Sequence, residues 1–220
     1  MPRSAPAVLL DVDGTLVDSN YQHTLAWARA LAAFDLVVPL WRIHRQIGKG
    51  GDRMVTDLCG EEAERAHGDA IREAEGERYA ELIGEVRPLP RARELLKTLD
   101  EQGTIVVLAS SCREEELEHY LDLLDARDLV QGATSSADAD TTKPAPDILE
   151  AALERAQTPR AVMLGDATWD CEAAANAGIP CVGLLTGGFS QQELRDAGAR
   201  EVFDELGTLV DALPGALAPA

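Results

Sequence analysis

A short apolar run at residues 7–10 leads directly into the segment Asp11-Val12-Asp13-Gly14-Thr15. The run has the length and composition of a buried strand, and open α/β sheets bind their ligands beyond the carboxyl ends of such strands. Two carboxylates this close repel each other unless a cation or a proton separates them. The segment therefore predicts a bound metal ion or two carboxyl groups with different pKa values, and both suit phosphoryl transfer.

Two later apolar runs also end in polar residues. Residues 105–109 precede Ser110, whose hydroxyl at a strand end can hydrogen-bond a phosphoryl oxygen. Residues 161–164 lead into Asp166, and Asp170 follows four positions later. Carboxylate oxygens at a strand end suit Mg²⁺, so Asp166 and Asp170 are candidate metal ligands.

Lys143 stands directly before Pro144, a residue that is pre-shaped for the first turn of a helix. We therefore expect a helix to begin here and to hold the lysine in place. Its ammonium can neutralise charge on Asp11 and on a transferring phosphoryl group, which phosphoryl transfer chiefly requires. An exposed lysine at a helix start is the alternative, and the helix dipole disfavours it.

The segment from Ser111 to Glu114 resembles a capping box for the next helix. We therefore assign the helix cap to Ser111 and the phosphoryl contact to Ser110. The two serines are close enough to exchange these roles, so Ser111 is also a candidate substrate ligand.

Taken in this order, the motifs resemble the four signature motifs of the haloacid dehalogenase superfamily, and the resemblance covers essentially the whole chain. It implies that Asp11 attacks phosphorus and that Asp13, two residues on, handles protons. Ser110 and Lys143 would then hold the phosphoryl oxygens.

The same resemblance implies a Mg²⁺ cofactor. Asp11, the backbone carbonyl of Asp13 and Asp166 would bind the ion directly, and Asp170 would lie behind these ligands. The alternative for Asp170 is an ordinary acidic residue that the dipole favours in the first turn of a helix.

Residues 18–85, here called the insert, contain no run that predicts a buried strand. His23, Trp27, Leu31 and Phe34 fall on one stripe of a helix. Further helical patterns cover residues 53–58, 61–67 and 71–83. By resemblance, the insert is a small helical cap domain.

The remaining residues, 1–17 and 86–220, would form the catalytic core. Helices and strands alternate along this part of the chain. The alternation predicts an α/β fold, in which helices flank a Rossmann-like parallel sheet through right-handed crossovers.

Residues 47–53 place Lys49 and Arg53 among glycines. The glycines let the backbone approach a ligand, and the two cations can meet an anionic group. The P-loop spacing is absent, so nucleotide triphosphate binding is not predicted. A flexible turn with solvated basic residues is the alternative. His23 is either a packed member of the apolar stripe, which we favour, or a hydrogen-bonding partner of the substrate near Asp13.

The formal net charge of −19 argues against nucleic acid or an anionic membrane as a partner. Much of the acidic excess lies in residues 61–85, which we expect to be a solvated helix face. No run reaches about 18 apolar residues and no secretory signal precedes the first strand, so we expect a cytoplasmic protein. Both a monomer and a homodimer are compatible with the sequence.

The four cysteines show no CxxC spacing, which argues against a zinc site or a redox pair and suits a reducing compartment. Cys112 lies near a helix N-terminus, where we expect the pKa of its thiol to fall. The small, apolar tail at residues 214–220 is expected to fray.

More than one reaction is compatible with the resemblance. Asp13 argues against a dehalogenase or a phosphonatase. A sugar phosphomutase similar to β-phosphoglucomutase is the rival, but the positions of its phosphate-binding arginine and cap lysine fall at Gly51 and near Glu75. Lys49 or Arg53 could replace them. We favour a Mg²⁺-dependent phosphomonoesterase that acts on a small phosphorylated metabolite through an aspartyl phosphate.

A non-catalytic binding module with this fold is the third possibility. Such a module has no evident reason to keep Asp11, Asp13 and Asp166 at one site, where their repulsion lowers stability unless a metal is bound. We therefore expect the partner to be a small phosphate ester, which the sequence does not identify further.

Overall fold

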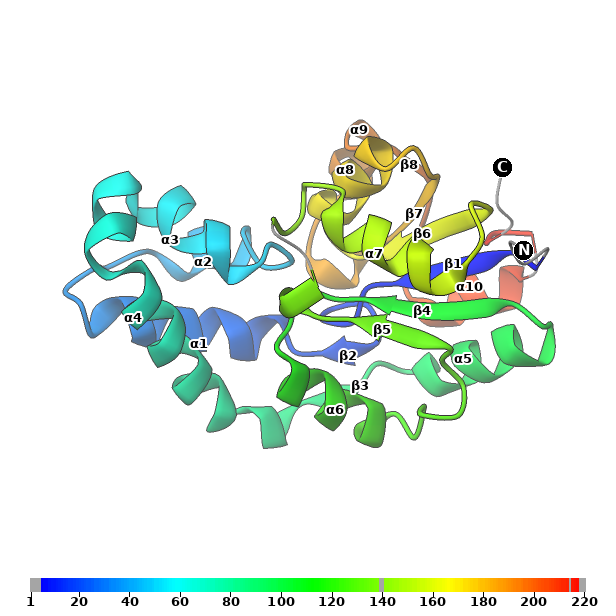
Figure 1. Ribbon diagram of the computed structural model, residues 1–220, viewed down its shortest axis with the longest axis horizontal. Coiled ribbons are helices and arrows are strands. Elements are labelled where there is room, and N and C mark those ends of the chain that lie inside the picture. The colour runs from blue at the N-terminus through cyan, green and yellow to red at the C-terminus, as the bar shows by residue number, and fades with distance from the viewer. Residues whose placement is uncertain (1–4, 139–140, 214, 218–220) are drawn as a thin grey trace.

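The computed structural model describes residues 5–138, 141–213 and 215–217. Its centre is a six-stranded sheet whose neighbouring strands are all parallel, in the order β5-β4-β1-β6-β7-β8 (Figure 1). These strands are β1 (Ala7–Leu10), β4 (Ile105–Ala109), β5 (Gly132–Thr134), β6 (Ala161–Gly165), β7 (Cys181–Leu184) and β8 (Ala199–Phe203). The predicted α/β fold is confirmed.

Helices cover both faces of this sheet (Figure 1). One face packs against α5 (Ala92–Glu101), α6 (Glu114–Leu123) and α10 (Leu206–Ala212). The other packs against α7 (Asp147–Ala156), α8 (Thr168–Asn176) and α9 (Gln191–Asp196). Short 3-10 turns are η2 (Ser136–Asp138) and η3 (Leu185–Gly187). A sheet covered on both faces needs strands that are apolar throughout, which explains the four-residue run of β1.

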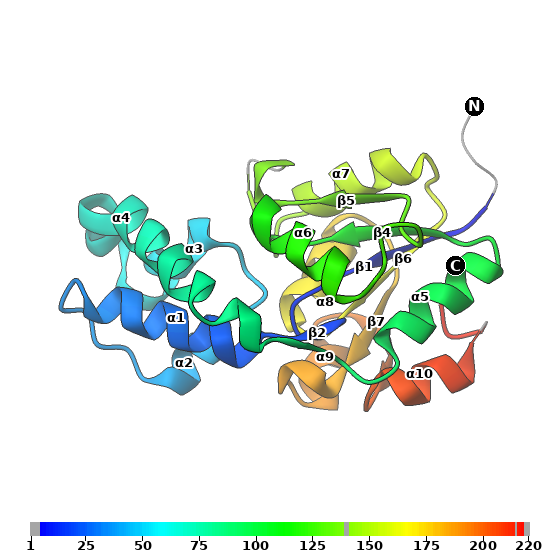
Figure 2. The same ribbon diagram turned by 90° about the horizontal axis from the view of Figure 1, so that it is seen from below.

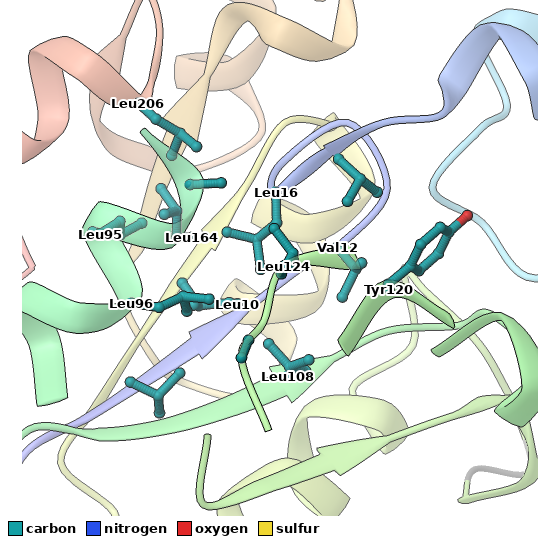
Figure 3. Close-up of a cluster of buried hydrophobic side chains, with 14 of the residues drawn as sticks. Leu10, Val12, Leu16, Leu95, Leu96, Leu108, Tyr120, Leu124, Leu164 and Leu206 are labelled. Atoms are coloured by element: carbon teal, nitrogen blue, oxygen red, sulfur yellow. The ribbon is translucent and has the colours of Figure 1, made fainter. Parts of the chain in front are cut away.

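Leucines form much of the core beneath the first of these faces (Figure 3). Leu10, Leu108 and Leu164 come from three adjacent strands and pack with Leu95 and Leu96 of α5. All five side chains are buried. Because β1 pairs with both β4 and β6, this packing fixes the central strand and the residue that follows it.

The insert forms a separate helical layer at one end of the sheet (Figures 1 and 2). The chain enters and leaves it through the antiparallel pair β2 (Val17–Asp18) and β3 (Arg87–Pro88). Its helices are α1 (Asn20–Ala32), α2 (Leu40–His44), α3 (Gly51–Cys59), α4 (Glu61–Ala80) and the 3-10 turn η1 (Ile83–Glu85). Trp27, Leu31 and Ile71 belong to its own apolar core, so the stripe predicted for the first helix is largely buried.

Two patterns predicted as separate helices, 61–67 and 71–83, form one helix, α4, which ends at Ala80. Ile71, Glu75 and Tyr79 recur every four residues on its buried side, and this stripe keeps the segment helical. Glu75 is therefore an exception to the solvated face expected for residues 61–85. No described helix combines the length and the apolar character needed to cross a membrane.

The helix expected to begin at Lys143 begins later. α7 starts at Asp147, with Pro146 directly before it. Pro146 rather than Pro144 is thus the proline at the helix start. Lys143 lies in the loop before α7, and its position must be fixed by other contacts.

The cap predicted for Ser111 is also wrong. α6 begins at Glu114, and the Arg113 N–H donates to the side chain of Glu116 at 3.1 Å. Glu116 reaches back as the acid of a capping box does, two residues later than the sequence pattern placed the box. Ser111 consequently does not cap α6 and remains a candidate substrate ligand.

Part of the C-terminal tail does not fray. Ala216 and Leu217 are buried and belong to the core that contains Leu10. The expectation was wrong for these two residues. Residues 214 and 218–220 of the same tail lie outside the described residues.

Leu96→Ala is expected to lower the free energy of unfolding by about 2–5 kcal/mol, because the fully buried side chain leaves a cavity when truncated. Leu40→Ala is the matched control. Leu40 is half exposed, and we expect a change within about 0.5 kcal/mol. Urea denaturation measures both, and equal losses would contradict this placement of the core.

Candidate active site

Three candidate residues follow three adjacent strands. Asp11 comes directly after β1, Ser110 after β4 and Asp166 after β6. β1 lies between the other two strands and is parallel to both. Parallel strands present their carboxyl ends at one edge of a sheet, so the fold itself brings these side chains together.

Asp11, Asp166 and Asp170 are buried at this edge, and one carboxylate oxygen of each lies within 4.8 Å of the others. The fully buried side chain of Lys143 lies among them. Its Nζ donates to Asp11 Oδ1 at 2.5 Å and lies 2.8 Å from Asp170 Oδ1. These two carboxylates hold the lysine.

Burial raises the pKa values of two of these carboxyl groups. It raises the pKa of Asp11 well above its usual value, although the charge of Lys143 opposes the shift. Burial and the charge of Asp170 raise the pKa of Asp166 to about 7. Burial lowers the pKa of Lys143, but the charges of Asp11 and Asp170 outweigh it and raise the pKa overall. Additional positive charge would stabilise the ionised carboxylates.

This donor set fits a divalent cation such as Mg²⁺. Asp11 Oδ2 is buried and has no hydrogen-bond partner in the described part of the chain, although buried carboxylate oxygens normally have one. Thr15 Oγ1 and Asn20 Nδ2 donate to the two oxygens of Asp166 at 3.2 and 2.9 Å and orient it. Carboxylate oxygens are ligands that Mg²⁺ prefers.

Gly14 allows the loop after β1 to pass close to Asp166. Its φ is +79°, and a Cβ atom there would lie 2.0 Å from Asp166 Oδ2. Only glycine combines this backbone conformation with so close an approach. The glycine of the first motif therefore lets the first and fourth motifs meet.

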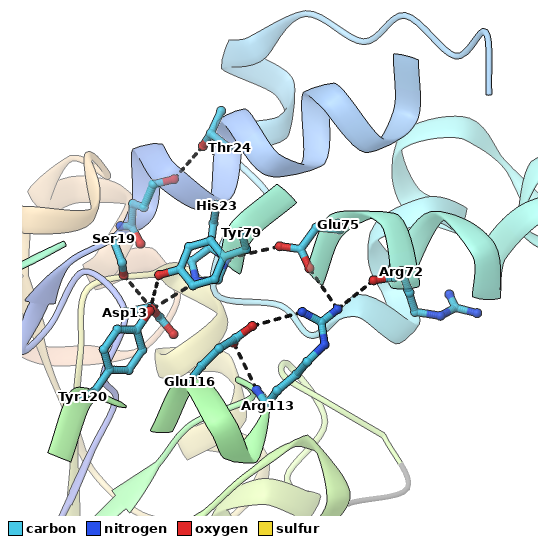
Figure 4. A network of polar contacts seen from close by, with 11 residues as sticks. Asp13, Ser19, His23, Thr24, Arg72, Glu75, Tyr79, Arg113, Glu116 and Tyr120 are labelled. Carbon is cyan, nitrogen blue, oxygen red and sulfur yellow. Dashed lines mark hydrogen bonds and ion pairs between the residues drawn. The ribbon is translucent and has the colours of Figure 1, made fainter. Parts of the chain in front are cut away.

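Asp13 is held from both the insert and α6 (Figure 4). Its Oδ1 accepts hydrogen bonds from Ser19 Oγ at 2.6 Å, Tyr120 OH at 3.1 Å and His23 Nε2 at 3.2 Å. Burial raises the pKa of Asp13, but the charge of His23 and these hydrogen bonds outweigh burial and lower it. Asp13 is therefore an ionised carboxylate with a fixed orientation.

His23 connects Asp13 to Glu75. Its Nδ1 lies 3.3 Å from Glu75 Oε1, and its ring stacks on Tyr79 with the ring centroids 3.7 Å apart. Burial lowers the pKa of His23, but Asp13 and Glu75 outweigh burial and raise it to about 10. Both ring nitrogens are then protonated and donate. His23 thus stacks on Tyr79 and also faces the site, and it is not part of the apolar core of the insert.

The two serines after β4 have different surroundings. Ser110 Oγ accepts a hydrogen bond from the Cys112 N–H at 3.1 Å. Ser111 Oγ is buried, has no partner among the described residues, and belongs to a residue that lines the cavity beside Asp13. Burial raises the pKa of Cys112 well above its usual value, so the expected lowering of this pKa was wrong.

The structure does not bring Lys49 and Arg53 together as a site for an anionic group. Lys49 lines the cavity, but its Nζ donates to Asp57 at 2.6 Å and lies 3.9 Å from the centroid of the Trp169 ring. Arg53 is exposed on α3 and does not line the cavity.

The cavity beside Asp13 has a volume of about 470 Å³ and lies between the insert and the core. Several of its polar contacts escaped sequence analysis. Arg113 donates to Glu75 at 3.1 Å, to Glu116 at 3.0 Å and to the backbone carbonyl of Arg72 at 2.7 Å. The buried stripe of α4 was an available signal for Glu75. No sequence signal pointed to Arg113, because its contact with Glu75 joins residues that are far apart in the chain.

The fold and the site together define a hydrolase built on an acidic sheet edge. The chain belongs to the haloacid dehalogenase-like hydrolases, since residues 5–178 match the model of that family. It is 29% identical to a phosphoglycolate phosphatase from Rhodospirillum rubrum, across 94% of this chain and 90% of that protein.

Solved structures agree with this assignment. A hydrolase from Pseudomonas syringae has a TM-score of 0.88 and 32% identity, covering 96% of this chain and all of the other. A putative β-phosphoglucomutase from Bacteroides vulgatus has a TM-score of 0.85 and 20% identity, covering 94% of this chain and 86% of that one. The second likeness shows the fold alone.

Lys143→Met is expected to destabilise the fold by about 3–5 kcal/mol at pH 8, because it leaves buried Asp11 and Asp170 without their cation. Protonation of Asp11, whose pKa is raised in the folded state, removes its repulsion with Asp170, and such a carboxyl group favours folding as the pH falls. The deficit should therefore shrink at pH 5.5.

Urea denaturation at the two pH values measures this deficit. Lys97→Met, at an exposed position of α5, is the control and should change little at either pH. A Lys143→Met variant as stable as the parent protein at pH 8 would contradict the role assigned to the lysine.

Proposed function

We propose that this hydrolase is a Mg²⁺-dependent phosphomonoesterase of small phosphorylated metabolites and that it works through an aspartyl phosphate. The position of Asp11 carries the proposal. It is a buried carboxylate at the end of the central strand, with Oδ1 held by Lys143 and Oδ2 unpaired among the described residues. The similarity to a phosphoglycolate phosphatase supports the same activity.

Asp11, Asp166 and the backbone carbonyl of Asp13 would hold the metal ion, with Asp170 behind them. When bound, Mg²⁺ would supply the positive charge that offsets the repulsion between a phosphoryl group and the carboxylates. Lys143 provides a second, fixed positive charge, and the hydroxyls of Ser110 and Ser111 are proposed donors to the phosphoryl oxygens.

In the first half of the proposed reaction, a carboxylate oxygen of Asp11 attacks phosphorus. A bond forms between these atoms while the bond from phosphorus to the ester oxygen breaks. Asp13 protonates the departing oxygen. Asp13 is ionised in the structure, and protonated His23 at 3.2 Å can share its proton with it.

In the second half, Asp13 accepts a proton from water, and the water oxygen attacks phosphorus. The bond from phosphorus to Asp11 breaks, and inorganic phosphate leaves. Asp13 passes the proton taken from water back to His23, which gave up its own in the first half, so both carboxylates and the protonated histidine are restored. The lowered pKa of Asp13 favours the ionised form that this step requires.

We propose that the insert acts as a cap domain on the core. The Gly50 N–H donates to Thr142 Oγ1 at 3.0 Å, and Thr142 also hydrogen-bonds Asp52. A Cβ atom at Gly50 would lie 2.2 Å from the Thr142 side chain. Thr142 directly precedes Lys143, so the insert packs against the loop that carries the lysine and helps to exclude water.

A cytoplasmic enzyme of small phosphate esters, without nucleic acid or membrane as a partner, agrees best with the surface and the cysteines. The formal net charge of −19 disfavours polyanionic partners. All four cysteines are free thiols, which suits a reducing compartment.

No specific observation favours the sugar phosphomutase. Glu75, close to the position of its cap lysine, is a buried carboxylate paired with His23 and Arg113. Lys49 is paired with Asp57, and Arg53 lies outside the cavity lining. The non-catalytic module is disfavoured because buried carboxylates with raised pKa values oppose folding at neutral pH.

Asp11→Asn is expected to abolish turnover, and Asp13→Asn to remove most of it, because the first loses the nucleophile and the second the proton-transfer group. Phosphate release from a panel of phosphomonoesters, with Mg²⁺ or with a chelator, measures both. Circular dichroism serves as the folding control. Near-normal release by folded Asp11→Asn protein would refute the proposed function.

A further inference from the structure

The cavity that would receive the leaving group is much larger than a two-carbon fragment requires. Its volume of about 470 Å³ falls within the roughly 300–1,000 Å³ of small-molecule pockets. Trp27 and Glu75 lie on its insert side, and Ser111 and Arg113 lie on its core side. A leaving group the size of a sugar fits beside Asp13.

Arg113 is not available as a receptor for a second anion. It reaches from the start of α6, which it directly precedes, to α4, and it donates to Glu75 at 3.1 Å and to Glu116 at 3.0 Å (Figure 4). Glu75 is only 4% exposed. If Arg113 moved toward a substrate carboxylate, the negative charge of buried Glu75 would lose part of its neutralising partner, which is unfavourable.

The other long basic side chains of the cavity are occupied in the same way. Arg72 pairs with Glu64 at 2.8 Å and with Asp69 at 2.7 Å. Lys49 pairs with Asp57 at 2.6 Å. Among the described residues that line the cavity, each lysine and arginine therefore already has a carboxylate partner.

The charge of His23 is already met by Asp13 and Glu75, and the other carboxylates of the cavity lining add negative charge. Asp52 and Glu73 also line the cavity. Carboxylates accept hydrogen bonds from hydroxyl groups, whereas they repel a second anion. Trp27, which is 6% exposed, adds an aromatic ring against which carbon atoms can pack.

Building on the proposed phosphomonoesterase activity, we propose that the leaving group of the substrate is an uncharged, hydroxyl-rich carbon chain or ring. Leaving groups with a carboxylate or a second phosphate are selected against. Phosphoglycolate, the compound in the name of the Rhodospirillum rubrum relative, carries such a carboxylate and is a poor substrate here.

Glucitol 6-phosphate and 6-phosphogluconate test this proposal, because they differ only in a terminal hydroxymethyl group against a carboxylate. Phosphate release in the presence of Mg²⁺ gives kcat/KM for each. We expect the glucitol ester to be preferred by about tenfold or more, since one like-charge contact in a partly desolvated cavity has that effect.

Equal values, or a preference for 6-phosphogluconate, would overturn the leaving-group proposal. Hydrolysis of p-nitrophenyl phosphate but of neither sugar derivative would overturn it too, while leaving the phosphomonoesterase activity intact. Release from none of the three esters would instead contradict the proposed function, and this inference with it.

Glu75→Gln provides the second test. It removes negative charge from the cavity and leaves Arg113 paired with Glu116 alone, so the preference for the glucitol ester should fall severalfold. An effect of the substitution on Asp13 is common to both substrates and cancels in the ratio. An unchanged ratio would overturn the proposal.

Glu77→Gln is the matched control, because Glu77 is exposed on the same helix and does not line the cavity. Its ratio should equal that of the parent protein. Glu73→Gln removes a charge from an exposed residue that lines the cavity, and it replaces Glu75→Gln if that variant does not fold. It should lower the preference in the same direction.

Discussion

Repulsion among buried carboxylates constrains the rest of this structure. The parallel sheet places Asp11 and Asp166 at one edge, and Asp170 joins them from the first turn of α8. Burial makes the ionised forms of Asp11 and Asp166 unfavourable, and Lys143 compensates only part of the charge. The fold tolerates this arrangement because leucine-rich packing around β1 holds the edge in place, and the arrangement is suited to receive a cation and a phosphoryl group.

The insert is coupled to the same chemistry through Asp13. His23 of α1 contacts Asp13 and Glu75, and Glu75 in turn contacts Arg113, which directly precedes α6. His23, whose charge lowers the pKa of Asp13, and Glu75, which pairs with His23, therefore also line the cavity that receives the leaving group. We infer that substrate choice and proton transfer are linked in this protein, because Glu75 lines the cavity and also contacts the histidine that holds Asp13.

Sequence patterns predicted the elements whose signal lies within a short stretch of the chain. Apolar runs followed by polar residues identified β1, β4 and β6, and the order of the motifs identified the family. Helix starts near Lys143 and Ser111 were wrong, because Pro146 and Glu116 competed with equally plausible local signals. Contacts across the chain were not predictable in this way, since they depend on how α4 and α6 meet after folding.

If Asp11 is the nucleophile, it carries the phosphoryl group during turnover. Acid quenching of the enzyme during steady-state turnover of p-nitrophenyl phosphate with Mg²⁺, followed by peptide mass mapping, tests it most directly. We expect one added phosphoryl group on the peptide that contains Asp11, and none on that peptide in Asp11→Asn protein. Rapid turnover without a phosphorylated peptide, or with the group on another residue, would contradict the role of Asp11 as the nucleophile.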